Sequence, residues 1–281
     1  MKTSLKSWIK AWCPPVLLQL RQARGAVRYD GDFGNWKSAE QMSSGYQAAD
    51  ILEKVADATR QVLAGNAVFE RDSRLFFQEE PNYPLAACLL LAAAREEGKL
   101  RVVDFGGSLG SVFFQNRCML AELKELVWNI VEQPHFVDCG KRLPMPECIR
   151  FHRDFRTALS ECRPNVILFS SVLQYLPDYH EILQQAIASQ AAWLLIDRTP
   201  LISGSDRCRI ALQTVPASLY AARYPVHFIG ERRLMRELEP EFELVTRFES
   251  YPFSIRLRGE KEPIRYHGFL WQRRKHACRG V

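Results

Sequence analysis

One stretch constrains the fold of this chain more than any other, residues 100–110 with the sequence LRVVDFGGSLG. A short apolar run containing Val102 and Val103 ends at Asp104, and glycines follow at once, before a segment with helical potential. This order is typical of a strand, a tight turn and a helix. Glycine has no Cβ, so such a turn can adopt positive φ and let a ligand lie against the backbone, while the helix start offers unpaired N–H groups. The stretch therefore predicts a ligand-binding turn.

The spacing of Gly106, Gly107 and Gly110 decides between two kinds of ligand. A dinucleotide-binding turn has the pattern G-x-G-x-x-G, with a pyrophosphate on the helix N-terminus. If Gly107 and Gly110 were its last two glycines, the first would fall on Phe105. The spacing therefore disfavours a dinucleotide. The pattern actually present is D-x-G-x-S-x-G over residues 104–110.

Two further carboxylates end the next two predicted strands. Glu132 follows an apolar run and lies about 30 residues after Asp104, the length of one βαβ unit. Its carboxylate accepts two hydrogen bonds side by side, which suits a ribose diol. Asp154 follows the run 148–153 and stands beside Phe155, a pair suited to accept from an adenine amine and to pack on its ring. The alternative for each acid is that it caps the next helix.

The middle of the chain alternates between strand and helix patterns. Strands are expected at 100–105, 126–132, 148–153, 165–170 and 192–197, with helices near 111–124, 134–142, 155–161 and 178–190. A helix at 231–238 and two strands at 242–248 and 264–272 follow. Alternation of this kind predicts a parallel sheet with helices on both faces and a ligand crevice at the carboxyl ends of the strands. Those ends hold Asp104, Glu132, Asp154, Ser170 and Asp197.

The first part of the chain is predicted to be helical, with no span long enough for a bilayer. An amphipathic helix is expected at 47–63, a polar connection over 71–80, and a buried helix at 85–94, well short of the ~20 residues that a bilayer requires. Residues 1–24 place Lys beside Trp, which suits either an interfacial helix on an anionic membrane or a segment packed on the protein itself. Lys10 interrupts any signal-peptide core.

The charge and cysteine content of the chain limit the kinds of ligand and partner to expect. The net charge of +6 suits an anionic substrate or a membrane surface, and no DNA- or RNA-recognition module is visible. The eight cysteines are scattered without a C-x-x-C pair, which fits a reducing cytoplasm and gives no zinc pattern. No metal site is therefore expected, and no oligomeric state is predicted.

The glycine turn resembles the first motif of class I S-adenosylmethionine-dependent methyltransferases, usually [D/E]-x-G-x-G-x-G, with Ser108 at the middle glycine. More narrowly, the chain is similar from about residue 30 to 272 to a methyltransferase family found among bacterial surface-polysaccharide genes. The similar segments are FGNWKSA (33–39), SGY (44–46), VDFGGSLG (103–110), WNIVEQP (128–134), SSVLQYL (170–176) and IDRTP (196–200).

The resemblance implies an α/β, Rossmann-like fold with a mostly parallel seven-stranded sheet, a C-terminal antiparallel hairpin and an N-terminal helical extension. It implies an extension over 1–98, a methyltransferase domain over 99–275 and a basic tail over 276–281. It also implies S-adenosylmethionine as cofactor, with Asp104 near its methionine end, Glu132 at the ribose and Asp154 at the adenine. The full expected cofactor set is Asp104, Phe105, Gly106, Gly107, Gly110, Glu132, Gln133, Asp154, Phe155 and Ser170.

Three residues are candidates for the chemistry at the acceptor. Methyl transfer is an in-line displacement, and a hydroxyl acceptor needs a general base, for which His is the first choice. His227 lies in the segment 224–228, a candidate substrate lid, and its alternative is a structural histidine. Asp197 and Arg198 end the fifth strand; Arg198 either clamps a phosphate or carboxylate or pairs with Asp197. Gln174, beyond the fourth strand, is a further contact to cofactor or acceptor or the start of a helix.

The resemblance implies a cytoplasmic enzyme of O-antigen or capsule assembly acting on a glycan or glycolipid, with residues 1–24 as an optional peripheral contact to the inner face of the membrane. Two other functions stay open. One is a catalytically silent protein of the same fold that assists polysaccharide assembly at the membrane. The other is a nicotinamide-dependent sugar reductase or epimerase.

Overall fold

The computed structural model describes residues 27–43, 48–216 and 222–275. The chain forms two compact units, of which the smaller comprises Met1–Tyr46 and Ile210–Val226 and the larger comprises Gln47–Arg209 and His227–Val281. The predictions for residues 1–24 and for the tail 276–281 lie outside the described residues.

The smaller unit is built on antiparallel strands that the sequence pattern did not reveal. β1 (Arg28–Phe33) pairs with β9 (Arg209–Val215), and β9 neighbours β10 (Ala222–Gly230). The short helix α3 (Trp36–Gln41) begins at Asn35, whose side chain accepts a hydrogen bond from the Ser38 backbone N–H at 2.9 Å. An Asn in this position satisfies one of the unpaired N–H groups at a helix start.

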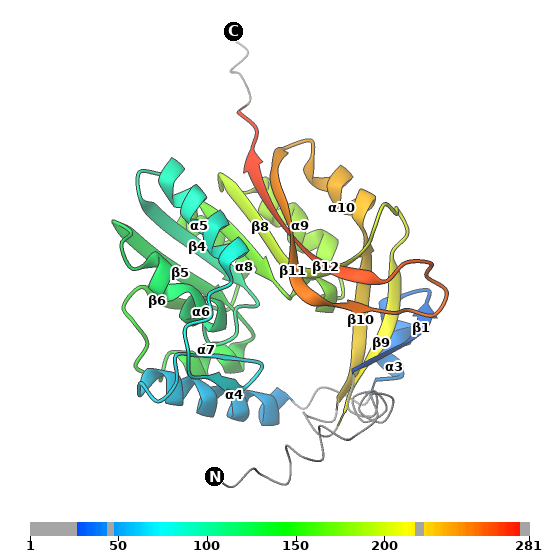
Figure 1. Cartoon of the computed structure of the whole chain (residues 1–281), viewed down its shortest axis with the longest axis horizontal. Coiled ribbons are helices and arrows are strands. Elements are labelled where there is room, and N and C mark those ends of the chain that lie inside the picture. Colours follow the sequence, from blue (N-terminus) through cyan, green and yellow to red (C-terminus); the bar gives the residue numbers. More distant parts are fainter. Residues whose placement is uncertain (1–26, 44–47, 217–221, 276–281) are drawn as a thin grey trace, which may run out of the picture. The chain divides into compact units, whose positions relative to one another are not determined.

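The larger unit holds the parallel sheet (Figure 1). Its parallel strands are β4 (Lys99–Phe105), β5 (Glu125–Val131), β6 (Ile149–His152), β7 (Val166–Ser170) and β8 (Trp193–Ile202). The hairpin of β11 (Phe242–Ile255) and β12 (Ile264–Arg273) joins this sheet through β12, which runs antiparallel to β8. The strand order is β6-β5-β4-β7-β8-β12-β11. The expected α/β fold, with a mostly parallel sheet and a C-terminal antiparallel hairpin, is confirmed.

Helices cover both faces of this sheet. One face packs on α5 (Tyr83–Arg95), α6 (Ser111–Leu120) and α7 (Pro134–Gly140), and the other on α8 (Phe155–Cys162), α9 (Tyr179–Ala188) and α10 (Glu231–Leu238). The helix α4 (Ala48–Leu63) packs on α7 and extends the core of the first face. Successive side chains of a strand point to opposite faces. Val102 and Leu195 accordingly belong to the core under α5 and α6, whereas Val103 and Ile196 belong to the core under α8 and α9.

The prediction of a polar connection over 71–80 is wrong for its first residues, up to Phe76. The hairpin of β2 (Phe69–Arg71) and β3 (Arg74–Phe76) occupies this region, and its turn is made by Asp72 and Ser73 at φ 52° and 62°. Asp and Ser form such turns because their short polar side chains bond the local backbone. The expected helices at 47–63 and 85–94 are confirmed as α4 and α5.

Strand β8 runs five residues further than the predicted end at Asp197, because both of its edges find partners there. β12 pairs with it up to Leu201, and the end of β10 pairs with Leu201 and Ile202 where β7 has already stopped. The segment 224–228, expected as a lid over the substrate, is part of β10. The strand assignment alone does not test the lid, which stays a prediction.

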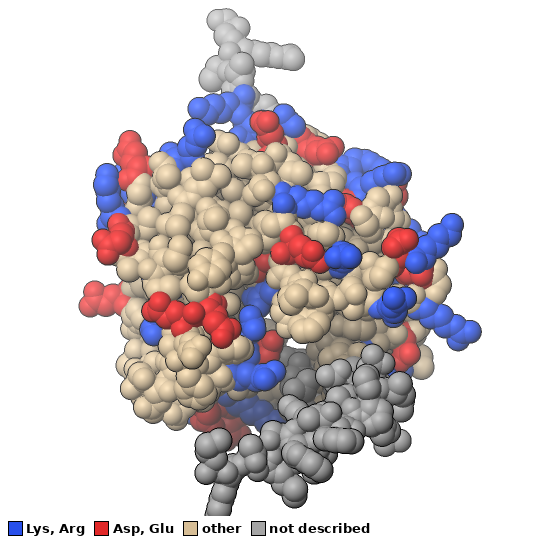
Figure 2. All heavy atoms as spheres, in the orientation of Figure 1, with Lys and Arg blue, Asp and Glu red and all other residues tan. Residues whose placement is uncertain are grey.

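Among the described helices, none is long and apolar enough to cross a membrane. Basic and acidic side chains are interspersed on the face shown in Figure 2.

Candidate functional site

The glycine turn between β4 and α6 has the positive backbone φ angles that its glycines predict. Gly106, Ser108 and Gly110 lie at φ 72°, 54° and 95°. The Gly106 N–H donates to the Val131 carbonyl on β5 at 2.9 Å, which fixes the turn against the neighbouring strand. A Cβ added to Gly106 would lie 2.4 Å from Cγ2 of Val172, so this position has no room for a side chain. The turn is a tightly packed bend at the carboxyl end of the sheet.

Asp104 lies directly beneath this turn and is 1% exposed. Its Oδ2 accepts a hydrogen bond from Nε1 of Trp128 at 3.0 Å, while its Oδ1 has no hydrogen-bond partner among the described residues. Burial raises the pKa of Asp104 to about 7; the Trp128 hydrogen bond and the charge of Arg198 work in the opposite direction. A buried carboxyl oxygen without a donor is uncommon, and the raised pKa of Asp104 favours the protonated carboxyl group, which tolerates such burial better than the charged one.

Glu132 comes directly after β5 and reaches back to the turn. Its Oε1 accepts from the Ser108 backbone N–H at 3.2 Å, and its Oε2 accepts from the Gln133 backbone N–H at 2.8 Å. Burial raises the pKa of the Glu132 carboxyl, and these two backbone hydrogen bonds lower it. The structure therefore brings together the turn and the carboxylates of two adjacent strands, as the sequence predicted.

Asp154 stands at the start of α8 and is exposed. Its Oδ1 accepts from the Thr157 N–H at 2.8 Å and the Thr157 hydroxyl at 2.7 Å, and these bonds lower the pKa of Asp154. This is the helix cap that the sequence left open as the alternative. Phe155 is buried, and its ring packs edge-on against Phe105 with centroids 4.8 Å apart. The adenine roles of Asp154 and Phe155 stay predictions.

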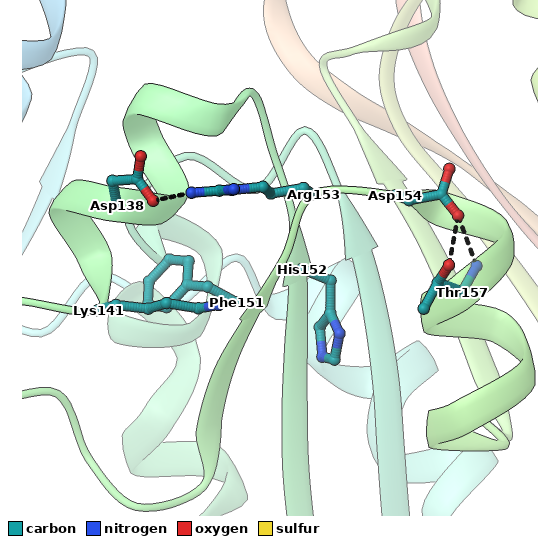
Figure 3. Close-up of a pocket in the computed structure, with 7 residues that line it drawn as sticks. All are labelled: Asp138, Lys141, Phe151, His152, Arg153, Asp154 and Thr157. Carbon is teal, nitrogen blue, oxygen red and sulfur yellow. Dashed lines mark hydrogen bonds and ion pairs between the residues drawn. The ribbon is translucent and has the colours of Figure 1, made fainter.

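Asp154 also lines an open pocket of about 400 Å³ at the carboxyl end of β6 (Figure 3). In that view Arg153 extends across to its ion-pair partner Asp138 on α7, while the Asp154 carboxylate turns to Thr157. The other lining residues are Lys141, Phe151 and His152.

A second polar cluster lies at the ends of β7 and β8. Ser170, the last residue of β7, is level with Asp197, and its hydroxyl donates to Asp197 Oδ2 at 2.9 Å. Arg198 lies 3.2 Å from the same oxygen through Nε and donates from Nη2 to the Ser170 hydroxyl at 2.9 Å. Arg198 thus forms the ion pair that the sequence left open as the alternative to an anion clamp. Burial raises the pKa of Asp197, and Arg198 lowers it.

His227 lies on β10 and is 7% exposed. Its ring meets Tyr179 edge-on with centroids 5.2 Å apart, and it is hydrogen-bonded to the backbone of Leu176 and Pro177. Burial lowers the pKa of His227, and these backbone bonds raise it. The structure thus surrounds His227 with packing partners, and its catalytic role stays a prediction.

Two site residues escaped the sequence analysis. Asn82, the cap of α5, donates from Nδ2 to Asp197 Oδ2 at 3.3 Å. Glu70 on β2 is 1% exposed and accepts hydrogen bonds from the hydroxyl of Ser111, the first residue of α6, and from the backbone N–H of Ser73. Asn before the Pro of a helix start is a recognisable capping signal, whereas nothing in the sequence marks Glu70.

The described residues include no cluster of three or more His, Cys, Asp or Glu side chains placed to hold a metal ion.

No protein-family model matches the chain, and no curated protein matches it. Solved structures do match. One is the Burkholderia thailandensis 1,6-didemethyltoxoflavin-N1-methyltransferase bound to 1,6-didemethyltoxoflavin and S-adenosylhomocysteine, 16% identical, with a TM-score of 0.42 over 83% of this chain and 92% of that one. Another is CalS10, an amino pentose methyltransferase from Micromonospora echinaspora with bound S-adenosylmethionine, 14% identical, with a TM-score of 0.45 over 72% of this chain and 99% of that one. The CcbJ methyltransferase from Streptomyces caelestis is 16% identical, with a TM-score of 0.44 over 69% of this chain and 90% of that one. At these identities the function has to be argued from the site.

Proposed function

We propose that this chain is an S-adenosylmethionine-dependent methyltransferase that methylates a hydroxyl of a sugar or lipid-linked glycan in surface-polysaccharide assembly. The observation that carries the cofactor assignment is the contact between Glu132 Oε1 and the Ser108 N–H at 3.2 Å. It joins the carboxylate after β5 to the glycine turn after β4. A nucleoside bound at this turn therefore has a carboxylate within reach of its ribose hydroxyls.

The chain's residues fit the rest of the cofactor. Asp104 lies directly under the turn, and its expected place near the methionine end of the cofactor rests on the sequence resemblance. Glycine is required at Gly106 and Gly107 by the packing of the turn, since a side chain there would overlap Val172 or Asp104. When bound, S-adenosylmethionine supplies an electrophilic methyl group on a sulfonium. The protein aligns that methyl group with the acceptor and excludes water.

The sugar or glycan acceptor and the polysaccharide setting rest on the sequence resemblance. The cytoplasmic location, including any peripheral contact with the membrane, is part of the same proposal. The segment 1–24 and the tail 276–281 lie outside the described residues, so the proposed membrane contact rests on the sequence alone.

Titration calorimetry with S-adenosylhomocysteine tests the cofactor assignment. Glu132→Ala removes the carboxylate and should abolish detectable binding, with an unchanged circular dichroism spectrum. Glu147→Ala, which removes an exposed carboxylate before β6, is the matched control and should bind as the wild type does. A folded wild type that does not bind, or a Glu132→Ala variant that binds normally, contradicts the assignment.

Incubation with labelled S-adenosylmethionine and glycolipid extracted from the source cell tests the acceptor. Label in the lipid fraction supports the enzyme. Binding of S-adenosylhomocysteine without transfer to any polysaccharide precursor favours the catalytically silent alternative. Binding of NAD in place of S-adenosylhomocysteine supports the reductase or epimerase.

A further inference from the structure

Three aromatic side chains gather on the C-terminal hairpin and are called the aromatic platform below: Tyr251 and Phe253 on β11 and Tyr266 on β12. The ring centroid of Tyr251 lies 5.1 Å from that of Phe253 and 5.6 Å from that of Tyr266. Phe253 is 64% exposed, and both tyrosines are partly exposed. Scattered apolar side chains are ordinary on a protein surface, whereas rings in contact present one continuous apolar patch to solvent.

The register of the sheet places the aromatic platform at the same end as the glycine turn. Tyr266 pairs with Pro200 on β8, three residues beyond Asp197, and Tyr251 pairs with Tyr266. Asp197 is level with Ser170, the last residue of β7. At about 3.3 Å per residue, Tyr266 lies roughly 10 Å beyond the carboxyl end of β7.

The aromatic platform also lies on the same face of the sheet as Asp104. Tyr266 is four residues before Leu270 on β12, so the two side chains project to one face. Leu270 belongs to the core under α5 and α6, together with Val102 of β4. Asp104 follows Val102 by two residues and projects to that face as well.

A hydrogen bond ties the hairpin to the end of β8. The Arg198 N–H, directly after Asp197, donates to the hydroxyl of Ser250 at 3.0 Å, and Ser250 precedes Tyr251. Gly268 on β12 makes room for this approach, because the ring of Phe248 lies where its Cβ would be, with ring atoms 2.2 Å from that position. The platform is thus anchored to the strand end that the proposed cofactor site uses.

The distance from Asp104 to Tyr266 is roughly 20 Å. The strand order β4-β7-β8-β12 makes β12 the third strand from β4, roughly 14 Å away at the usual strand spacing. Asp104 is level with Leu168, Leu195 and Leu270 along that order, and Tyr266 lies a further four residues, roughly 13 Å, towards the carboxyl end. A single sugar ring beside the cofactor does not span this distance, whereas a glycan of a few rings does.

Resting on the proposed function, we propose that the aromatic platform is a subsite for one ring of an oligosaccharide acceptor, further along the glycan than the ring that is methylated. A pyranose ring carries C–H groups on its faces and hydroxyls around its rim. The C–H groups bear partial positive charge and pack on the negative face of an aromatic ring. The hydroxyl of a tyrosine, at the edge of its ring, both donates and accepts hydrogen bonds and so suits the rim.

The size of the aromatic platform disfavours a second copy of this chain as its occupant. An aromatic side chain buries about 150–250 Å² when it is fully covered. Three such side chains, two of them already partly buried, offer less than the roughly 800 Å² per partner that a stable protein interface needs. One or two sugar rings match the area that is available.

Saturation-transfer NMR with the oligosaccharide released from the glycolipid of the source cell tests the subsite, on protein saturated with S-adenosylhomocysteine. The oligosaccharide should bind to the wild type. Phe253→Ala should weaken this binding roughly tenfold, the scale of losing one aromatic contact, and Phe253→Tyr, which keeps the ring, should restore it. Because Phe253 is 64% exposed, the thermal melt should stay unchanged. Glu249→Gln, which removes an exposed carboxylate paired with Arg265 on the same hairpin, is the matched control and should bind normally.

Steady-state kinetics in the glycolipid assay give a second readout. Phe253→Ala should raise KM about tenfold and leave kcat unchanged, because the platform holds a ring away from the reacting atoms and so binds it equally in the ground state and the transition state.

Calorimetry with S-adenosylhomocysteine separates the two proposals, and wild type and Phe253→Ala should bind it equally. If the wild type does not bind it, the proposed function fails and the subsite fails with it. If the wild type binds it but not the oligosaccharide, if Phe253→Ala holds the oligosaccharide as the wild type does, or if KM is unchanged, only the subsite is overturned.

Two further measurements detect the other occupants. Sedimentation velocity reports self-association, and flotation with vesicles of phosphatidylethanolamine and phosphatidylglycerol, free of glycolipid, reports binding to a lipid surface. Self-association or vesicle binding that Phe253→Ala abolishes assigns the platform to a second copy or to lipid and overturns the subsite.

Discussion

Substituting Gly107 by alanine tests whether the carboxylate of Asp104 is packed as tightly under the turn as the structure indicates. A Cβ at Gly107 would lie 2.5 Å from Asp104 Oδ2 and 2.6 Å from its Cγ, whereas ordinary contacts begin at about 3.4 Å. Gly107 is not among the glycines with positive φ, so alanine meets no backbone penalty there. The whole effect of the substitution therefore comes from the clash.

Relief of that clash needs a movement of about 1 Å by a side chain that is 1% exposed and bonded to Trp128 Nε1 at 3.0 Å. Such a movement lengthens or breaks the hydrogen bond and strains the packing, so Gly107→Ala should lower the free energy of unfolding by about 2–3 kcal/mol. Urea unfolding measures this. Affinity for S-adenosylhomocysteine, measured by calorimetry, should fall as well, because the displaced carboxylate no longer supports the turn.

Two comparisons isolate the cause. Gly34→Ala is the matched control: its Cβ meets nothing within 4 Å, and stability should stay within about 0.5 kcal/mol of the wild type. In an Asp104→Ala background, where the clashing atoms are gone, Gly107→Ala should cost much less than in the wild type, a coupling that a double-mutant cycle reports. An equal cost in both backgrounds would refute the reasoning.

Two further predictions concern the acids of the site. The pKa of Asp104 is raised to about 7 from its ordinary 3.8, so the folded protein binds this proton more tightly than the unfolded chain does. The contribution of Asp104 to the free energy of unfolding therefore increases as pH falls from about 7 towards 4, by up to about 1.4 kcal/mol per pH unit. The difference in unfolding free energy between wild type and Asp104→Asn, measured over this pH range, should show the increase. A difference that does not change with pH contradicts the raised pKa. For Asp154, substitution by serine keeps a good helix cap and removes the carboxylate, so stability should change by less than about 0.5 kcal/mol while S-adenosylhomocysteine binds roughly tenfold more weakly. Unchanged affinity in Asp154→Ser assigns Asp154 to the cap alone.

The parts of the fold that the sequence predicted well are those set by local pattern. The strand before Asp104 and the helix after Gly110 are observed at the expected places, because apolar runs and glycines act within a few residues of themselves. The helix Glu231–Leu238 is observed with its expected bounds for the same reason.

The parts that were missed depend on partners far away in the chain. The extension of β8 exists because Arg265 of β12 pairs with Leu201, and no pattern within residues 198–202 announces that pairing. No strand was expected around His227, yet the segment is part of β10, with Pro225 inside it. Proline is tolerated in strands only where its missing N–H costs nothing, a condition that depends on the neighbouring strand and not on the local sequence.

The candidate site shows the same division between local and distant causes. Ser108 in place of the usual glycine was visible in the sequence, and the structure shows why serine works: its backbone adopts φ 54° while its N–H donates to Glu132. Ser171 and Arg198 adopt the same left-handed region without any local signal, since the conformation is imposed by hydrogen bonds that join β7 to β8 and β8 to Ser250 on β11. Ser108 comes shortly after the end of β4, and Ser171 directly follows the end of β7. Arg198 directly follows Asp197, the residue of β8 that pairs with Ser170 at the end of β7. Three of the seven non-glycine residues at positive φ in the described part of the larger unit thus lie along one edge of three neighbouring strands, the edge that also carries Asp104 and Asp197, and tertiary contacts hold the backbone in this conformation there.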